Sequence, residues 1–343
     1  MDVTDDNPSF VLNLQDIANN EQSFPSQEFG DFMNIVIKRG LSESVGNEIL
    51  KLTRRICRDD VILPTSIKQG YQIVDSMKIS HLEFQKNNVM TYNDETYYLF
   101  HRPILDGVKE LLTNKELFEL CIFDYMPLYN NRERIYGEQY NGKWWGKAHN
   151  SLPNNGKVLS IILYSDATTC DFLGKSSEHP IYLTLGNIPN WRRNKPDAKV
   201  VIGYLPKIKA KTNSEKKNNS YLLAKRIIYQ NSFEIIINTL LDYKNCGMKI
   251  ITPSGDNLWC FPFISQIIGD IPEQASITLT YNSINCNCPC SICVVSSNDL
   301  NNIDLKLEDI CIRTPQNMQK VIADGDAKEF SLHETENIFW KYP

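Results

Sequence analysis

An apolar run from Lys157 to Ser165, KVLSIILYS, constrains the fold of this chain more than any other segment. It is rich in apolar and β-branched residues, which is typical of a strand in a buried sheet. Asp166 follows it directly, so the strand would present a carboxylate at its end. Metal sites that cut nucleic acid commonly begin with such a strand, and they need a second carboxylate from elsewhere in the chain.

The next segments predict more strands and one long helix. IYLTLGNI and KVVIGYLP are β-branched runs between loops with Gly, Pro and Asn, and they predict a second and a third strand. Apolar residues nearly surround the helix expected over residues 221–243, so we expect it to be buried against the sheet. MKIIT and LWCFPF predict short strands, ISQIIG continues the apolar pattern, and SITLTY predicts a further strand beyond Pro272.

This order of three strands, a helix and further strands favours an α/β (α+β mixed) fold, with an incomplete RNase H-like core and a mixed sheet. A doubly wound nucleotide fold fits less well, because the chain has neither G-x-x-x-x-G-K-[ST] nor a strand-linked G-x-G-x-x-G. With 343 residues, it can bury one large core or two modest ones. We expect a disordered lead-in over residues 1–28, a mainly helical region over 29–150 and the RNase H-like core over 151–343.

The mainly helical region begins with two helical patterns on either side of Gly40, with Ser42 or Ser44 as the cap of the second helix. Such a pair is either a DNA-reading helix-turn-helix or a short packing module. Aromatic residues are dense between Met126 and Leu152, where they would stack on bases or cover the edge of a core.

Asp270, in IIGDIPEQ, is the candidate for the second carboxylate, and Asp256, in PSGDN, is the alternative. Breaking or joining a phosphodiester needs charge compensation at two oxygens, which two divalent ions held by carboxylates supply. Mg²⁺ suits this role because it prefers oxygen ligands and keeps several waters. Asp166 would be the bridging ligand. The structural alternative is that each Asp serves a cap or a turn.

Positive charge is concentrated between Trp191 and Arg226, although the whole chain has a net charge of −5. Eleven Lys and Arg stand against two acidic residues in this segment, a net charge of +9. A localised phosphate-contacting face would need such an asymmetry, and a solvated surface around SEKKNNS is the alternative. The candidate DNA contacts are Arg192, Arg193, Lys195, Lys207 and Lys209.

The segment NCNCPCSIC contains Cys286, Cys288, Cys290 and Cys293. Cys290 and Cys293 have the spacing of one zinc knuckle, Cys286 or Cys288 would be a third ligand, and Cys260 or Cys311 the fourth. Reduced or buried thiols are the alternative.

The compartment follows from the start of the chain and the cysteines. The first residues, MDVTDDNPSF, are acidic and unlike a secretory signal, and no run of about 18 apolar residues is present. Ten irregularly spaced cysteines are typical of a reducing compartment. We therefore expect a nuclear or cytoplasmic protein that is not secreted and has no membrane partner.

Several segments resemble one family. The stretch YSDATTCDFLGKSSEHPIYLTLGNIPNWRRNKPDAKVVIGYLP is similar to a segment of Plavaka-type transposases, in the Kyakuja-Dileera-Zisupton group. YGEQYNGKWWGKAHNSLP, FPFISQIIGDIPEQ, CPCSICVV and GLSESVGNEILKL are also similar to segments of that family. The resemblance covers most of residues 28–343.

The resemblance implies a DDE-type transposase, a transposable-element protein that cleaves and transfers DNA strands with divalent metal ions. Asp166 falls on the family's first catalytic acid, Asp270 on the acid of its DxPEQ motif, and Cys290 and Cys293 on its zinc knuckle. The implied cofactors are Mg²⁺ and structural Zn²⁺. The implied partners are DNA at transposon ends and further copies of the chain in a homo-oligomer, and the implied activity is DNA recombination in the nucleus.

One departure from the family pattern concerns the third acid. The chain ends at ENIFWKYP, which resembles the segment that precedes the family's histidine-containing region and the helices expected to bear that acid. The resemblance therefore implies a C-terminally truncated fragment that is inactive alone. The alternative is a non-catalytic DNA- or protein-binding module that uses the basic segment 191–226 and the zinc knuckle.

Overall fold

The computed structural model describes residues 11–14, 24–58, 60–77, 82–170, 176–283 and 285–342. Contacts divide the chain into two compact units, one made of residues 1–15 and 84–343 and the other of residues 16–83. This division falls at a different place from the expected boundary near residue 150. Within the described part of the chain, no helix is both long and apolar enough to cross a bilayer.

The described residues of the smaller unit form three helices, α1 (Gln27–Arg39), α2 (Glu43–Ile56) and α3 (Ile67–Ser76). Each begins at a serine whose hydroxyl accepts a hydrogen bond from the backbone N–H three residues later. Gly40 ends α1 in a left-handed conformation with φ of 58°, which glycine adopts without strain. The predicted helical pair around Gly40 is therefore confirmed, with Ser42 as the cap of α2.

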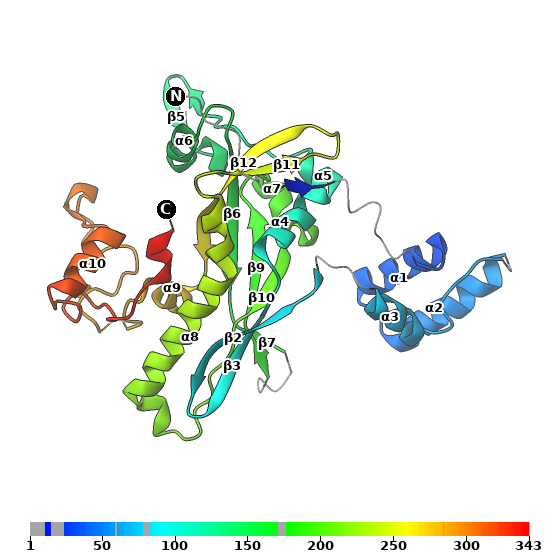
Figure 1. Cartoon of the computed structure of the whole chain (residues 1–343), viewed down its shortest axis with the longest axis horizontal. Helices are drawn as coiled ribbons and strands as arrows, with labels where there is room; N and C mark the ends of the chain where they lie inside the picture. The colour runs from blue at the N-terminus through cyan, green and yellow to red at the C-terminus, as the bar shows by residue number, and fades with distance from the viewer. Residues whose placement is uncertain are drawn as a thin grey trace. The chain divides into compact units, whose positions relative to one another are not determined.

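The larger unit is built on one mixed sheet, in which the described residues form eight strands in the order β1-β11-β12-β6-β9-β10-β3-β2 (Figure 1). Two neighbouring pairs, β1 with β11 and β12 with β6, are parallel, and the other pairs are antiparallel. The α/β expectation is confirmed. The strands are β1 (Val11–Asn13), β2 (Gln85–Tyr92), β3 (Glu95–His101), β6 (Lys157–Ser165), β9 (Pro180–Leu185), β10 (Val200–Tyr204), β11 (Met248–Ile251) and β12 (Asn257–Ile268).

Strand β1 lies inside the segment 1–28, for which we expected a disordered lead-in. Its residues pair in parallel with β11, so this part of the lead-in is an edge strand of the sheet. Residues 1–10 and 15–23 of the lead-in lie outside the described residues.

The centre of the sheet follows the predicted order. Strands β6, β9 and β10 form an antiparallel meander, α8 (Asn219–Ile237) follows it, and β12 returns to pair in parallel with β6. β12 runs unbroken through both LWCFPF and ISQIIG. The strand predicted from SITLTY is wrong, because Asp270 caps a helix, α9 (Ile271–Thr278), whose second residue is Pro272.

Shorter elements complete the larger unit. Two small two-stranded sheets lie outside the main one. Their strands and the remaining helices are β4 (Leu128–Asn130), β5 (Glu133–Ile135), β7 (Thr168–Thr169), β8 (Ser177–Glu178), α4 (Ile104–Thr113), α5 (Lys115–Phe118), α6 (Lys143–Asn150), α7 (Asn190–Arg193) and α10 (Pro315–Ala323).

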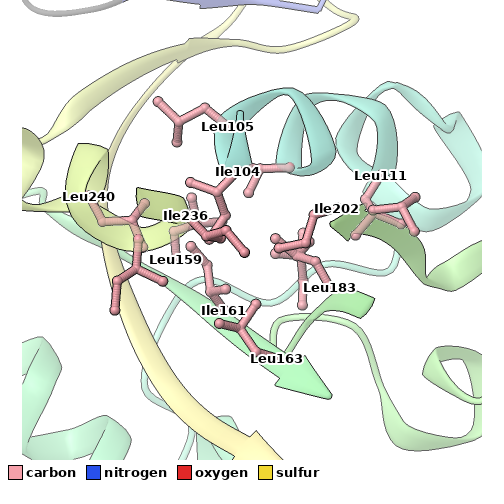
Figure 2. Packing of buried hydrophobic residues seen from close by; sticks show 14 of the residues in the cluster. Ile104, Leu105, Leu111, Leu159, Ile161, Leu163, Leu183, Ile202, Ile236 and Leu240 are labelled. Atoms are coloured by element: carbon pink, nitrogen blue, oxygen red, sulfur yellow. The ribbon is translucent and has the colours of Figure 1, made fainter. Parts of the chain in front are cut away.

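The main hydrophobic core lies between the sheet and helices α4 and α8. Figure 2 shows Leu159, Ile161 and Leu163 of β6 together with Ile104 of α4 and Ile236 of α8. All five side chains are buried. Since β6 is covered on this side, its backbone position is tied to the packing of both helices.

Asn187, two residues after the end of β9, is hydrogen-bonded to the beginning of β6. Its fully buried side chain donates hydrogen bonds to the carbonyls of Ile122 and Val158 and accepts one from the N–H of Ser160, each at 2.9 Å. The preceding Gly186 is required because a Cβ there would collide with the side chains of Gln139 and Ser160. Gly186 and Asn187 of the GNIP motif therefore both have a structural role in positioning β6.

Removing a buried side chain from β6 should destabilise the larger unit. We expect Leu163→Ala to lower the free energy of unfolding by about 2 to 5 kcal/mol, because it removes apolar packing and leaves a cavity. The matched control is Leu300→Ala, since Leu300 is 55% exposed, and its effect should stay within about 0.5 kcal/mol. Urea unfolding followed by circular dichroism measures both, and equal midpoints for the two variants would contradict this account of the core.

Candidate active site at the ends of β6 and β12

The register between β6 and β12 brings Asp166 and Asp270 to the same edge of the sheet. Ile268 pairs with Tyr164 at the end of the parallel ladder, and each aspartate follows its partner by two residues. Neighbouring strands lie about 4.8 Å apart. A Cβ built on Gly269 would lie 3.6 Å from the carbonyl oxygen of Ser165, so the two chains stay close beyond the ladder.

Tyr164 hydrogen-bonds Asp166 and lies within electrostatic range of Asp270. Its hydroxyl donates a hydrogen bond to Asp166 Oδ2 at 3.1 Å, and its ring lies 6.0 Å from that of Tyr182. The pKa of Tyr164 is raised by burial, by this hydrogen bond and by the negative charges of Asp166 and Asp270. Both aspartates therefore act electrostatically on one phenol, in agreement with the strand register.

Asp270 is also the cap of α9. Its Oδ1 accepts a hydrogen bond from the backbone N–H of Glu273 at 2.9 Å. The positive end of the α9 dipole therefore faces this carboxylate. Asp270 is exposed and Asp166 is half-buried, so a ligand can reach the pair from solvent.

Glu273 forms a half-buried polar group with Tyr229 and His179, three residues after Asp270. Its Oε2 accepts a hydrogen bond from the hydroxyl of Tyr229 at 2.9 Å, and its Oε1 lies 3.1 Å from His179 Nε2, although this nitrogen is not aligned for a hydrogen bond. Burial, followed by the charge of Glu273, raises the pKa of Tyr229. Glu273 was not among the residues predicted for the site. Its position three residues after a cap is a signal that could have found it.

The donor set at this edge suits a hard divalent cation only in part. Asp166 and Asp270 offer carboxylate oxygens, which Mg²⁺ prefers. Each has one oxygen hydrogen-bonded within the chain. Among the described residues, no group of three or more His, Cys, Asp or Glu side chains is arranged to hold a metal ion.

Asp256, the alternative second acid, lies at the other end of β12. It precedes Asn257, where the strand begins, and its Oδ2 accepts a hydrogen bond from the hydroxyl of Ser254. β12 has twelve residues, so at about 3.3 Å for each residue its length alone separates Asp256 from Asp270 by roughly 40 Å. It cannot share a cation with Asp166.

The predicted DNA contacts fall into two groups. Arg192 is buried and forms a bidentate ion pair with Asp197, at 2.8 and 2.6 Å. Arg193 donates to the carbonyl of Ile188 at 3.0 Å, and burial lowers its pKa. Both guanidinium groups therefore have partners within the chain.

The three lysines differ from the arginines. Lys195 and Lys209 are exposed. Lys207 is half-buried and donates to the carbonyl and the hydroxyl of Ser177. The role of all five residues in DNA binding stays a prediction.

The structure brings together two of the four clustered cysteines. The thiols of Cys290 and Cys293 lie close enough that, beside the effect of burial, each shifts the pKa of the other, which lowers the pKa of Cys290 and raises that of Cys293. The thiol of Cys286 instead contacts the carbonyl of Ser283 at 2.8 Å, and that of Cys288 the carbonyl of Val294 at 3.5 Å. The guanidinium of Arg313 holds this loop, because it donates to the carbonyls of Cys288, Cys290 and Cys293.

The two candidates for a fourth zinc ligand lie in different places. Cys260 is fully buried in β12, and burial raises the pKa of its thiol to about 12. Cys311 is exposed and lies beside the cluster, because the next residue, Ile312, forms a β-bridge with Cys293. Of the two, Cys311 is therefore the one within reach of Cys293.

His333 predicts a pH dependence of stability. Burial and the positive charge of Arg226 lower its pKa to about 4, against about 6.5 in an unfolded chain. Between these values the unfolded state binds the proton more readily, so the free energy of unfolding falls as the pH drops from 6.5 to 4. We expect His333→Gln to reduce this slope, and the ring signals to titrate near pH 4 by NMR. Titration near pH 6.5 would contradict the burial described here.

Comparison with known proteins identifies the family of this chain. A search of curated proteins gives no match. The family model described as Plavaka transposase matches residues 65–342, which include both aspartates, the basic segment and the cysteine cluster. The chain belongs to the Plavaka transposase family.

Proposed function

We propose that the larger unit is an RNase H-like core that performs metal-dependent DNA strand cleavage and transfer, with Asp166 and Asp270 as its catalytic carboxylates. The observation that carries this proposal is the parallel register of β6 and β12, which ends both strands in an aspartate at one edge. The sheet order β10-β9-β6-β12 and the helix α8 between β10 and β12 support the RNase H-like assignment. Membership of the Plavaka transposase family supports the reaction class.

The residues around the pair have defined roles in this proposal. Asp166 and Asp270 hold Mg²⁺, which supplies charge compensation at the attacking and leaving oxygens when it is bound. Tyr164 orients the carboxylate of Asp166, and the backbone N–H of Glu273 orients that of Asp270. Two carboxylates supply only part of a two-metal ligand set, so residues 1–343 alone should have little strand-transfer activity.

The remaining parts of the proposal concern partners and the second metal. The partner is DNA at transposon ends in the nucleus, bound by a homo-oligomer of this chain. Lys195, Lys207 and Lys209 contact its phosphates, with Arg192 and Arg193 as the buried support of this surface. A structural Zn²⁺ is held by Cys290 and Cys293, and Cys286 or Cys288 joins them only if a thiol turns away from its carbonyl partner.

The acid pair can be tested by metal binding. We expect Asp166→Asn and Asp270→Asn each to weaken Mn²⁺ or Mg²⁺ binding at least about tenfold, since even the loss of a residue that only supports a ligand costs 10 to 100-fold. Asp256→Asn is the matched control, because it removes the same charge at the far end of β12. Isothermal titration calorimetry measures the affinities, and assays of DNA nicking test the chemistry. Equal affinities in all three variants would overturn the proposed site.

The DNA surface can be tested by salt dependence. The double variant Lys195→Gln and Lys209→Gln should weaken binding of duplex DNA and reduce the slope of log K against log salt by about 0.9 for each phosphate that is no longer neutralised. Lys320→Gln is the control, because Lys320 is exposed and lies outside the basic segment. An unchanged slope in the double variant would refute the proposed role of these lysines. DNA binding without any binding of divalent ions would favour the non-catalytic module.

A further inference from the structure

A cavity of about 570 Å³ lies next to the chain segments that follow β6 and β12, and its lining contains neither Asp166 nor Asp270. Its wall includes Ala167, which directly follows Asp166, and Pro272 and Glu273, which follow Asp270. The opposite wall comes from the first half of α8 and from the chain that leaves β10. A volume of this size lies in the range of small-molecule sites, which is about 300 to 1,000 Å³.

The cavity has a cationic side. Lys207, Lys225 and Arg226 line it. Arg226 is half-buried, and no hydrogen bond or ion pair to its guanidinium is found among the described residues. A guanidinium in this situation favours an anionic ligand, and phosphate matches its planar donors best.

The single acid in the wall does not cancel this preference. Glu273 is directed to Tyr229 and His179 by the interactions described above. His333, which also lines the cavity, is neutral at physiological pH because its pKa is near 4. The charges available to a ligand are therefore those of Lys225 and Arg226, together with Lys207, whose amine also binds Ser177.

The rest of the wall suits a flat apolar ring. Leu205, Pro206, Ile208 and Leu222 contribute apolar surface, and the ring of Tyr221 lies among them. The hydroxyl of Tyr221 donates to the carbonyl of Ile208 at 3.2 Å, which fixes that ring. Fixed aromatic rings stack on nucleobases without selecting a sequence.

We infer that this cavity receives one unpaired nucleotide of a DNA strand, with its phosphate at Arg226 and Lys225 and its base against Tyr221 and the apolar wall. The inference rests on the proposed function, because the adjacent acid pair would act on the same strand. A nucleotide that leaves the base stack here would hold the neighbouring phosphodiester at Asp166 and Asp270. Nucleotides that are already unpaired enter such sites at the lowest energetic cost.

The test compares two fluorescent DNA duplexes that differ by one unpaired terminal nucleotide. Anisotropy is measured without added Mg²⁺ or Mn²⁺, so that failure of the metal chemistry cannot affect the result, and without EDTA, which would remove the proposed structural Zn²⁺. We expect the full chain to bind the overhang duplex several-fold more tightly than the blunt one. Arg226→Gln should abolish this preference, because the loss of a charge-assisted hydrogen bond costs about tenfold or more in affinity.

Three further variants separate an effect on the cavity from misfolding, from general loss of charge and from loss of the acid pair. Lys225→Gln changes an exposed residue of the same wall, so it should fold normally and also reduce the preference. Lys216→Gln is the matched control, because Lys216 is an exposed residue of the same basic segment outside the cavity. Asp166→Asn should retain the preference, which separates this inference from the proposed catalysis.

The outcomes that would overturn the inference are direct. One is equal binding of the overhang and blunt duplexes by the unchanged chain. Another is an equal loss in Lys216→Gln and in the two cavity variants, which would indicate general charge attraction. A third concerns the source of the nucleotide: if free thymidine monophosphate binds with the same dependence on Arg226 while the overhang adds nothing, the cavity is a mononucleotide site instead.

Discussion

The parallel pairing of β6 with β12 is the constraint on which the candidate site depends. It runs from the pair Lys157 and Cys260 to the pair Tyr164 and Ile268, with one register shift near Ser265. A slip by one residue would turn every side chain to the opposite face. Burial of one face of β6 against α4 and α8 opposes such a slip, because the apolar side chains would lose their packing. The position of the two aspartates is therefore a consequence of the core.

Local patterns were sufficient for the centre of the fold and for the positions of Asp166 and Asp270 just beyond strand ends. β6 is buried over most of its length and β12 in its middle, and both give apolar runs that are easily recognised. The β-branched residues of SITLTY favour a strand, but the cap at Asp270 and the proline after it favour a helix, and α9 forms. The aromatic piece that forms β3 is strand-like in its sequence. Its place beside β10 depends on long-range pairing, which no local pattern reports.

The polar surroundings of the site could not be predicted in the same way. Glu273, Tyr229 and His179 lie far apart in the chain, and only the packing of α8 beside α9 and the start of β9 brings them together. The net charge of the basic segment also overestimates the positive charge that a ligand can reach. The net charge of the basic segment includes Arg192 and Arg193, whose guanidinium groups are engaged inside the fold. The cations of this segment that a ligand can still reach are mainly lysines and Arg226. Arg226 lines a cavity and does not lie on an open surface.

The acid pair is better suited to binding a ligand than to stabilising the fold. In the proposed site, two carboxylates at neighbouring strand ends would repel each other, and the phenol of Tyr164 and the N-terminus of α9 would offset part of this repulsion. Each of these two groups also orients its carboxylate, because the hydrogen bond fixes the position of one carboxylate oxygen. Preorganisation of this kind reduces the cost of ordering ligands when a cation arrives. In the proposed function, a cation held by both aspartates would offset their negative charges at the ends of β6 and β12.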